Sequence, residues 1–439
     1  MFSAKSADNT KNRKWDFWLL SAGVVIYFLV NFQRSSIPGT IFNELQHDFN
    51  ATAAQVTNIS AVFMYVYAIT QLIAGLTADK FGGVRTIFWG GLVFCVGSLI
   101  FPVCSNLSWL LAGRVLVGLG AGMIYLALVK EIDRIYPNTF TSVLGTVILL
   151  GYAGSILGGL PLSAAVKVVP WRWTFAFIGV VTLIGYLLFV FCKHHVKSIP
   201  VRREKLSLFP FWVVLQSRNS WVLLVAGGVG YAVYYLMLAV LGKKLLEDFC
   251  GTPPVVAGGC LSLMVIVSGG MNFLIGRLST KFGNLRKPFL LLTLGFALLG
   301  SVLGMIGLQL KAGTWFFAIV LILIAASAGF SAVTNSLMRE YNPPQYTGSG
   351  ASILNFVAYL AVAIFGNISG WMMDKFSFGK AEKVAEATIY PASSYMAVML
   401  LALFISIAAI AAALALPETH GQNLYRLKKL ERNRQRSIK

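Results

Sequence analysis

The sequence predicts an all-helical membrane protein whose twelve transmembrane helices form two pseudo-symmetric bundles of six. The chain of 439 residues is 57% hydrophobic and only 12% charged, whereas soluble globular proteins average about 25% charged residues. Apolar runs recur along nearly the whole length, and each is long enough to cross ~30 Å of hydrocarbon as a helix. A charged segment also occurs twice, and this repeat indicates a duplicated bundle.

The duplicated segment lies between two apolar runs in each half of the chain. Its first copy, 75–85, reads GLTADKFGGVR, and its second copy, 276–287, reads GRLSTKFGNLRK. The two copies start 201 residues apart (276 − 75). A second repeat, Lys130-Glu131 and Arg339-Glu340, has a similar offset of 209 residues (340 − 131). Two repeats with similar offsets predict a parallel six-plus-six duplication.

Each membrane span is predicted from an apolar run bounded by charged or turn-forming residues. The expected spans are approximately 17–43, 57–78, 87–104, 109–129, 140–166, 173–192, 219–242, 255–279, 288–308, 315–338, 348–373 and 392–416. On this assignment the side of the termini carries 26 of the 36 Lys and Arg residues, the other side carries 8, and Arg34 and Arg114 lie within spans. This asymmetry predicts cytoplasmic termini in a multi-pass plasma-membrane protein. The compact loops favour the bacterial inner membrane.

The spans divide the chain into two bundles joined by a basic connector. We expect an N-terminal bundle over 1–192, a cytoplasmic linker over 193–218, a C-terminal bundle over 219–421 and a basic tail over 422–439. The net charge of +20 is explained by basic loops and tails, so no nucleic-acid partner is expected. The linker could touch anionic headgroups, although a solvated loop is favoured.

The residues for enzymatic chemistry are missing from the sequence. The five cysteines have no CxxC spacing, and the four histidines fall in predicted loops or tails. No nucleophile–base set, phosphate loop or metal-ligand cluster is present. We therefore expect neither an enzyme nor a cofactor or metal site.

The first predicted helix carries the clearest candidate for substrate binding. Tyr27, Asn31, Arg34 and Pro38 are spaced four, three and four residues apart, which places them on one helical stripe. A charge inside the membrane costs ~2.5–3.5 kcal/mol on insertion scales and therefore needs a partner. A guanidinium suits a carboxylate or phosphate through a two-pronged contact. The alternative is that Arg34 only extends to the headgroups.

Further candidates lie on the fourth, seventh, tenth and eleventh helices. They are Arg114, Tyr125, Tyr231, Tyr234, Tyr235, Asn335 and Asn355. Packing between helices is the alternative role for most of them. Lys243 and Lys244 end the seventh helix on the outer side, where interfacial anchoring is favoured over a place in the cavity. No Asp, Glu or His lies in the middle of a span, so coupling to protons is in doubt.

Several motifs together resemble the major facilitator superfamily over residues 15 to 421. The segment 75–85 resembles the signature loop between its second and third helices, although Val84 replaces a usual basic residue. The segment 114–122 (RVLVGLGAG) resembles the fourth-helix motif, with Val117 where glutamine is frequent. Glycines in 151–159, the segment WRWTF at 171–175 and PETHG at 417–421 resemble further motifs. Residues 31–49 also resemble the first helix of the organophosphate and anion:cation carriers.

The resemblance implies a gate and a central cavity. The first, fourth, seventh and tenth helices would line the cavity, and an arginine at the position of Arg34 would bind an anionic group. The gating residues would be Gly75, Asp79, Lys80, Arg85, Arg134 and Lys281. Asp79 would accept hydrogen bonds from the start of the eleventh helix and pair with Arg134. The glycines of 151–159 would serve helix packing or a sliding surface between bundles.

These observations predict a secondary active transporter. It would move a small polar, anionic organic solute by alternating access between its two bundles. The alternatives are an exporter of a drug or metabolite and a transporter-like membrane sensor. We expect a monomer whose partners are the lipid bilayer and a small-molecule substrate.

Overall fold

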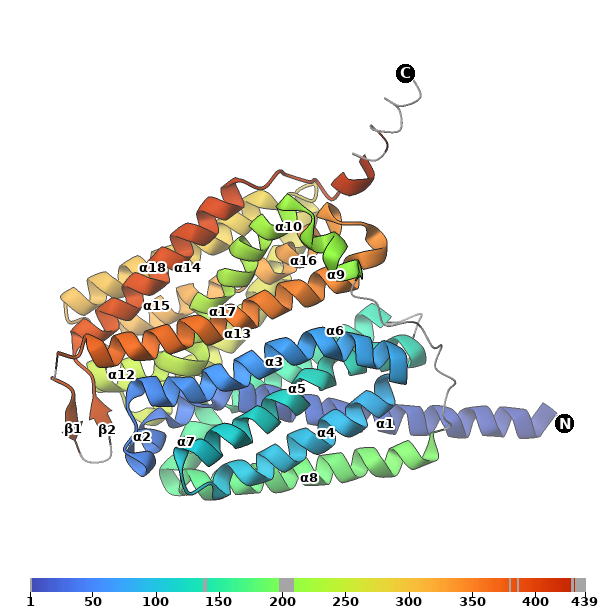
Figure 1. Cartoon of the computed structure of the whole chain (residues 1–439), viewed down its shortest axis with the longest axis horizontal. Helices are drawn as coiled ribbons and strands as arrows, with labels where there is room; N and C mark the ends of the chain where they lie inside the picture. The colour runs from blue at the N-terminus through green and yellow to red at the C-terminus, as the bar shows by residue number, and fades with distance from the viewer. Residues whose placement is uncertain are drawn as a thin grey trace.

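The computed structural model describes residues 2–136, 140–196, 209–378, 380–384, 387–427 and 430. Two groups of long helices lie side by side, with their axes running along the length of the molecule (Figure 1). The described part contains 12 helical spans long and apolar enough to cross a membrane. This confirms the predicted fold class.

The N-terminal bundle contains six spans and several short helices. Its elements are α1 (Phe2–Ser36), η1 (Gly39–Ile41), α2 (Phe42–Phe49), α3 (Ala53–Phe81), α4 (Gly83–Ile100), η2 (Phe101–Val103), α5 (Leu107–Ile135), α6 (Phe140–Leu157), α7 (Leu160–Val168) and α8 (Trp171–His195). The first span ends earlier than predicted, at Ser36, because Pro38 disfavours helical backbone at the residue before it. The short α2 follows as a separate element.

The C-terminal bundle repeats this pattern with a more irregular first span. Its elements are α9 (Phe209–Leu215), α10 (Arg218–Leu223), η4 (Leu224–Val229), α11 (Tyr231–Leu236), η5 (Met237–Leu241), α12 (Gly242–Cys250), α13 (Pro254–Lys281), α14 (Lys287–Gln309), α15 (Thr314–Ser327), α16 (Phe330–Tyr341), η6 (Pro344–Tyr346), α17 (Thr347–Lys375), β1 (Glu382–Val384), β2 (Ala387–Ile389) and α18 (Ala392–Leu414). The elements η4 and η5 are π-helical turns within the seventh span. Such turns are frequent at functional sites.

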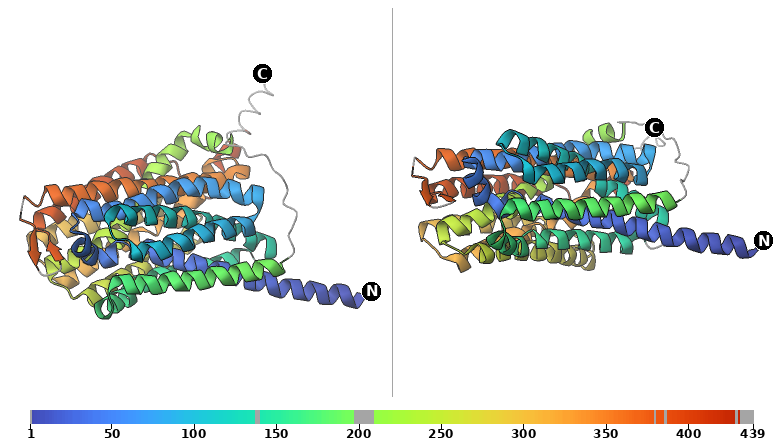
Figure 2. Two further views of the ribbon diagram at one scale, coloured as in Figure 1. Left: turned by 60° about the horizontal axis from the view of Figure 1, so that its bottom comes forward. Right: turned by 90° about the horizontal axis from the view of Figure 1, so that it is seen from below.

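The two ends of the molecule differ in construction. The short strands β1 and β2 pair antiparallel, with Glu382 opposite Ile389, and they lie at one end beside α2 (Figure 1). We call this the hairpin end. The start of α1 and the described residues 417–427 after α18 lie at the opposite end, which we call the termini end, and α1 projects there beyond its neighbours (Figure 2).

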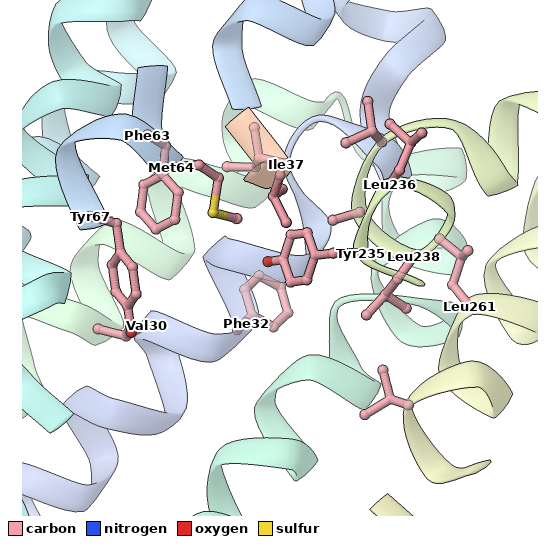
Figure 3. Close-up of a cluster of buried hydrophobic side chains, with 14 of the residues drawn as sticks. Val30, Phe32, Ile37, Phe63, Met64, Tyr67, Tyr235, Leu236, Leu238 and Leu261 are labelled. Atoms are coloured by element: carbon pink, nitrogen blue, oxygen red, sulfur yellow. The ribbon is translucent and has the colours of Figure 1, made fainter. Parts of the chain in front are cut away.

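Apolar side chains from both bundles meet near the centre of the molecule. Figure 3 shows Phe32 of α1 and Met64 of α3 near Tyr235, Leu238 and Leu261 of the C-terminal bundle. All five side chains are buried. Lipid tails are as apolar as these side chains, so close van der Waals packing stabilises the contact more than exclusion of water does.

Glycines bring α6 and α7 close to their neighbours on two sides. A Cβ atom at Gly154 would clash with the carbonyl oxygen of Phe28, so α6 packs directly on α1. Gly159 instead faces Ser262 of α13, and Gly258 of α13 faces Ser163. The glycines of 151–159 therefore serve packing within the N-terminal bundle and, at Gly159, the contact between bundles.

Candidate functional site

A cavity of about 490 Å³ lies between the two bundles. This volume is within the range of small-molecule sites, roughly 300–1,000 Å³. Its wall includes residues from α1, α3, α5, α6, the seventh span, α13, α16 and α17. The wall extends from Arg34 to Val129 and Gly348, which lie toward the termini end.

Arg34 projects into this cavity from α1. Its Nη1 donates to the hydroxyl of Tyr359 at 3.0 Å, and its Nη2 donates to Oδ1 of Asn31 at 2.6 Å. Its Cζ lies 5.8 Å from the ring centroid of Tyr67 and 5.7 Å from that of Tyr359. Its buried Nε has no hydrogen-bond partner among the described residues. The guanidinium is thus held by aromatic and amide groups, without a carboxylate.

Tyrosines form most of the aromatic surface of the cavity. The eight that line it are Tyr27, Tyr67, Tyr125, Tyr152, Tyr231, Tyr234, Tyr235 and Tyr359. The hydroxyl of Tyr235 donates to the carbonyl oxygen of Arg34 at 2.8 Å, and that of Tyr234 donates to Ser268 at 2.9 Å. Rings with hydroxyl groups can contact both the apolar body and the polar groups of a ligand.

The cavity is positively charged. Among its lining residues, all within the described part of the chain, Arg34 is the one charged side chain. The polar remainder consists of hydroxyl and amide groups, such as Gln71, Asn272 and Thr334. A ligand that carries a negative group would therefore meet an uncompensated cation.

Nine of the ten candidate binding residues line the cavity; the tenth, Arg114, does not. The guanidinium of Arg114 is fully buried, and its Cζ lies 4.4 Å from the ring centroid of Phe63. None of its three nitrogen atoms has a hydrogen-bond partner in the described part of the chain.

Sequence reasoning missed part of the cavity wall. Tyr67 and Gln71 of α3, Tyr152 of α6 and Ser268 of α13 all line it. On α3 the four-residue spacing of Phe63, Tyr67 and Gln71 was a usable signal, since it places them on one helix face.

The hairpin end is closed by buried polar contacts between the bundles. Lys243 forms an ion pair with Glu247 at 3.0 Å, and its Nζ also donates to the carbonyl oxygen of Thr40 at 2.6 Å. Lys244 forms an ion pair with Asp248 at 2.8 Å and donates to Oδ1 of Asn43 at 2.6 Å. The prediction that these lysines anchor the helix at the membrane interface was wrong, because their side chains are only 2% and 0% exposed.

A carboxylate of α17 joins the bundles at the same end. Asp374 accepts hydrogen bonds from the backbone N–H groups of Ala53 at 3.0 Å and Ala54 at 2.8 Å, at the start of α3. Its Oδ1 also accepts from the hydroxyl of Tyr390 at 2.8 Å. A negative group is favourable at a helix N-terminus. We call Asp374 and these two N–H groups the hairpin-end lock.

The predicted gate lies at the opposite end and is described only in part. The side chain of Asp79 and the surroundings of Gly75 lie outside what the structure describes, so the gating role of both residues stays a prediction. Lys80, Arg85 and Lys281 have exposed side chains. Arg134, expected beside Asp79, forms ion pairs with Asp16 at 2.8 Å and Glu131 at 2.6 Å.

The fold and the cavity agree with a known transporter family. Residues 23–366 and 244–431 match the family model of the Major Facilitator Superfamily. The chain belongs to this superfamily. It is thus a multi-pass membrane transport protein rather than an enzyme, with a small-molecule substrate.

The chain is similar to several bacterial proteins that carry a multidrug-resistance name. The chain is 24% identical to the "Putative multidrug resistance protein MdtD" of Salmonella dublin, over 83% of this chain and 87% of that protein. The protein of the same name from Salmonella typhi has the same identity and coverage.

Two solved structures show how well the fold agrees. A bacterial homologue of the human lysosomal transporter Spinster, inward-facing and unoccupied, gives a TM-score of 0.71 at 16% identity, over 91% of this chain and 96% of that one. The peptide transporter POT in complex with sulfate gives a TM-score of 0.73 at 15% identity, over 93% of this chain and 96% of that one. At such identities the likeness concerns the fold alone.

Proposed function

We propose that this transporter moves a small organic anion with an aromatic or otherwise planar body. The observation that carries the proposal is Arg34, the one charged side chain on a cavity wall that also includes eight tyrosines. A carboxylate or phosphate would neutralise the guanidinium, and the tyrosine rings would contact the rest of the solute.

The free donor capacity of Arg34 supports an anionic ligand. Its Nε–H has no acceptor among the described residues, and its other nitrogen atoms donate to the neutral side chains of Asn31, Tyr67 and Tyr359. Charge-assisted hydrogen bonds are about twice as strong as neutral ones. A ligand carboxylate would therefore displace neutral partners at a gain in free energy.

The arrangement of the bundles supports alternating access. The cavity wall extends toward the termini end, while the hairpin-end lock holds the opposite end closed. The excess of Lys and Arg at the termini end favours a cytoplasmic location for it, in a bacterial inner membrane. Residues 1–192 and 219–421 would then rock as two units, joined by the linker 193–218 and followed by the tail 422–439.

Binding measurements on purified protein test the anionic substrate. A thermal-shift screen of aromatic and aliphatic carboxylates, sugar acids and organophosphates identifies a ligand, and calorimetry measures its affinity. Arg34→Ala should weaken binding about 30-fold or more, since truncating one partner of a buried charge pair costs ~2–5 kcal/mol. Arg34→Lys should bind at intermediate strength because it keeps the charge without the planar fork.

A control separates recognition from the loss of one positive charge. Arg277→Ala removes an exposed guanidinium of α13 that lies outside the cavity, and it should bind as tightly as the unchanged protein. Wild-type affinity in Arg34→Ala would refute the anionic substrate. Uptake of the ligand into vesicles then distinguishes a carrier from a membrane sensor that binds without transport.

A second candidate is export of aromatic drugs or metabolites. The MdtD relatives carry a multidrug-resistance name, and the aromatic wall of the cavity would accept varied planar compounds. The same screen decides between the two candidates. Tight binding of neutral or cationic aromatic compounds that is unaffected by Arg34→Ala would favour the exporter of drugs.

A further inference from the structure

A second cavity, of about 420 Å³, lies at the termini end of the C-terminal bundle, apart from the central one. Its lining residues come from the α13–α14 turn, α16, the segment after it and the tail. They are Asn284, Arg286, Ser336, Arg339, Glu340, Pro344, Gly421, Asn423 and Arg426. Three arginines and one glutamate give this lining a net charge of +2 (3 − 1).

The negative group of this cavity is already neutralised. Oε1 of Glu340 accepts from Nη2 of Arg286 at 3.1 Å and from its Nε at 3.2 Å. Oε2 of the same carboxylate accepts from the hydroxyl of Thr419 at 2.5 Å. Both oxygens are therefore engaged, and Glu340 positions Arg286 rather than repelling an incoming anion.

The other two guanidinium groups remain without a counter-charge. Arg339 and Arg426 are exposed, and neither side chain has a hydrogen bond or ion pair to another described residue. The tail that carries Arg426 is nevertheless held in place, because Nδ2 of Asn423 donates to the carbonyl oxygens of Arg339 at 2.8 Å and Asn342 at 2.9 Å. The backbone N–H of Arg426 in turn donates to Oδ1 of Asn423 at 3.0 Å.

We propose that this cavity binds a phosphate group. Guanidinium groups match the geometry of phosphate oxygens, and the amide of Asn284 and the hydroxyl of Ser336 add neutral donors. The phosphate can belong to an anionic lipid headgroup or to a soluble phosphate compound. In the sequence, Lys428 and Lys429 follow Arg426 closely and add to the positive charge of this stretch of the tail.

The test compares two arginine pairs in purified protein. The first double variant is Arg339→Gln with Arg426→Gln, within the cavity. The matched control is Arg218→Gln with Arg277→Gln, which removes two exposed guanidinium groups at the same end but outside the cavity. The probes are short-chain phosphatidylglycerol and inorganic phosphate, and binding is measured by native mass spectrometry and thermal shift.

The expected result is binding of at least one probe to the unchanged protein. The cavity variant should bind this probe about 30-fold more weakly. Each basic group near a phosphate contributes on the order of a fivefold increase in affinity, and the variant removes two such groups. The control variant should stay within about twofold of the unchanged protein. Binding of the lipid alone assigns a headgroup site, binding of inorganic phosphate alone assigns a soluble ligand, and binding of both assigns the shared phosphate chemistry.

Two results would overturn the proposal. One is that neither probe binds the unchanged protein. The other is that the cavity variant loses no more binding than the control variant, which would show attraction by overall charge or binding elsewhere instead of a site in this cavity. Both arginine pairs are exposed, so unchanged melting temperatures without probe confirm that the variants are folded. Because the central cavity is not involved, either outcome is independent of the substrate of transport.

Discussion

Replacing Asp374 by asparagine should open the hairpin end. The change keeps the size of the side chain but removes its charge. Asparagine has one acceptor oxygen, whereas the N–H groups of Ala53 and Ala54 each contact a separate oxygen of Asp374. The amide NH₂ would therefore face one of these donors, and the start of α3 would lose its negative partner.

The expected free-energy change follows from these contacts. An unsatisfied buried donor costs roughly 1–3 kcal/mol, and a charge at a helix N-terminus contributes about 0.3–1 kcal/mol. Because Asp374 is partly exposed, we expect Asp374→Asn to destabilise the closed hairpin end by about 2 kcal/mol in total. The lock exists only with the hairpin end closed, and this value changes the ratio of closed to open molecules about 30-fold. A ratio of about 100:1 would become about 3:1.

Distances between spin labels at the hairpin end measure this ratio. Val103 and Leu310 are 74% and 73% exposed and belong to different bundles, so labelled cysteines at these positions report their separation. The five native cysteines are first replaced. In Asp374→Asn, a longer-distance population should grow to about a quarter of the molecules.

A matched variant tests whether the lock itself is responsible. Glu382→Gln removes one negative charge from an exposed position on the neighbouring hairpin. It should leave the distance distribution unchanged. If Asp374→Asn also leaves it unchanged, the contacts of Asp374 do not determine which end is open.

Three further results are expected. Gly258→Leu should reduce transport and favour an open hairpin end, because its side chain would meet Ser163 across the bundle contact; normal rates would contradict this close approach. Although partial burial raises the pKa of Glu418, the backbone N–H groups of Arg286 and Thr419 lower it overall. Glu418 therefore stabilises the protein above its unfolded pKa of about 4.3, and the melting temperature should fall further on acidification below this pH than in Glu418→Gln. Exchange of substrate in vesicles should persist when an ionophore collapses the proton gradient, because the described cavity wall has no carboxylate; complete loss would reveal an unrecognised proton relay.

The fold could be predicted because membrane crossing leaves a strong local signal. Twelve apolar runs and the repeated segments at 75–85 and 276–287 were sufficient, since lipid requires helices of about 20 apolar residues. The position of Arg34 on the cavity wall also followed from a local pattern, the stripe with Tyr27 and Asn31. Such patterns depend only on residues within two or three helical turns.

The hairpin-end lock could not be predicted in this way. Asp374 and Ala53 are 321 residues apart, and the partners of the aspartate within the lock are backbone N–H groups, which no residue type marks. The pairing of Lys243 with Glu247 was different, because four-residue spacing of opposite charges was visible in the sequence. The missing information was that α12 is enclosed by protein, so that its charges need partners on the same helix.

The hairpin of β1 and β2 lies between the membrane-spanning helices α17 and α18 in the sequence, and it contacts both bundles at the closed hairpin end. The carbonyl oxygen of Thr388 accepts from Nζ of Lys244 at 2.6 Å, and the hydroxyl of Tyr390 accepts from Nε2 of Gln46 in α2 at 3.4 Å. An antibody fragment or small designed protein that binds the hairpin and α2 together would hold both bundles in the arrangement in which the hairpin end is closed. It would act as a non-competitive inhibitor whose potency is independent of the substrate concentration, and it would need no access to the central cavity.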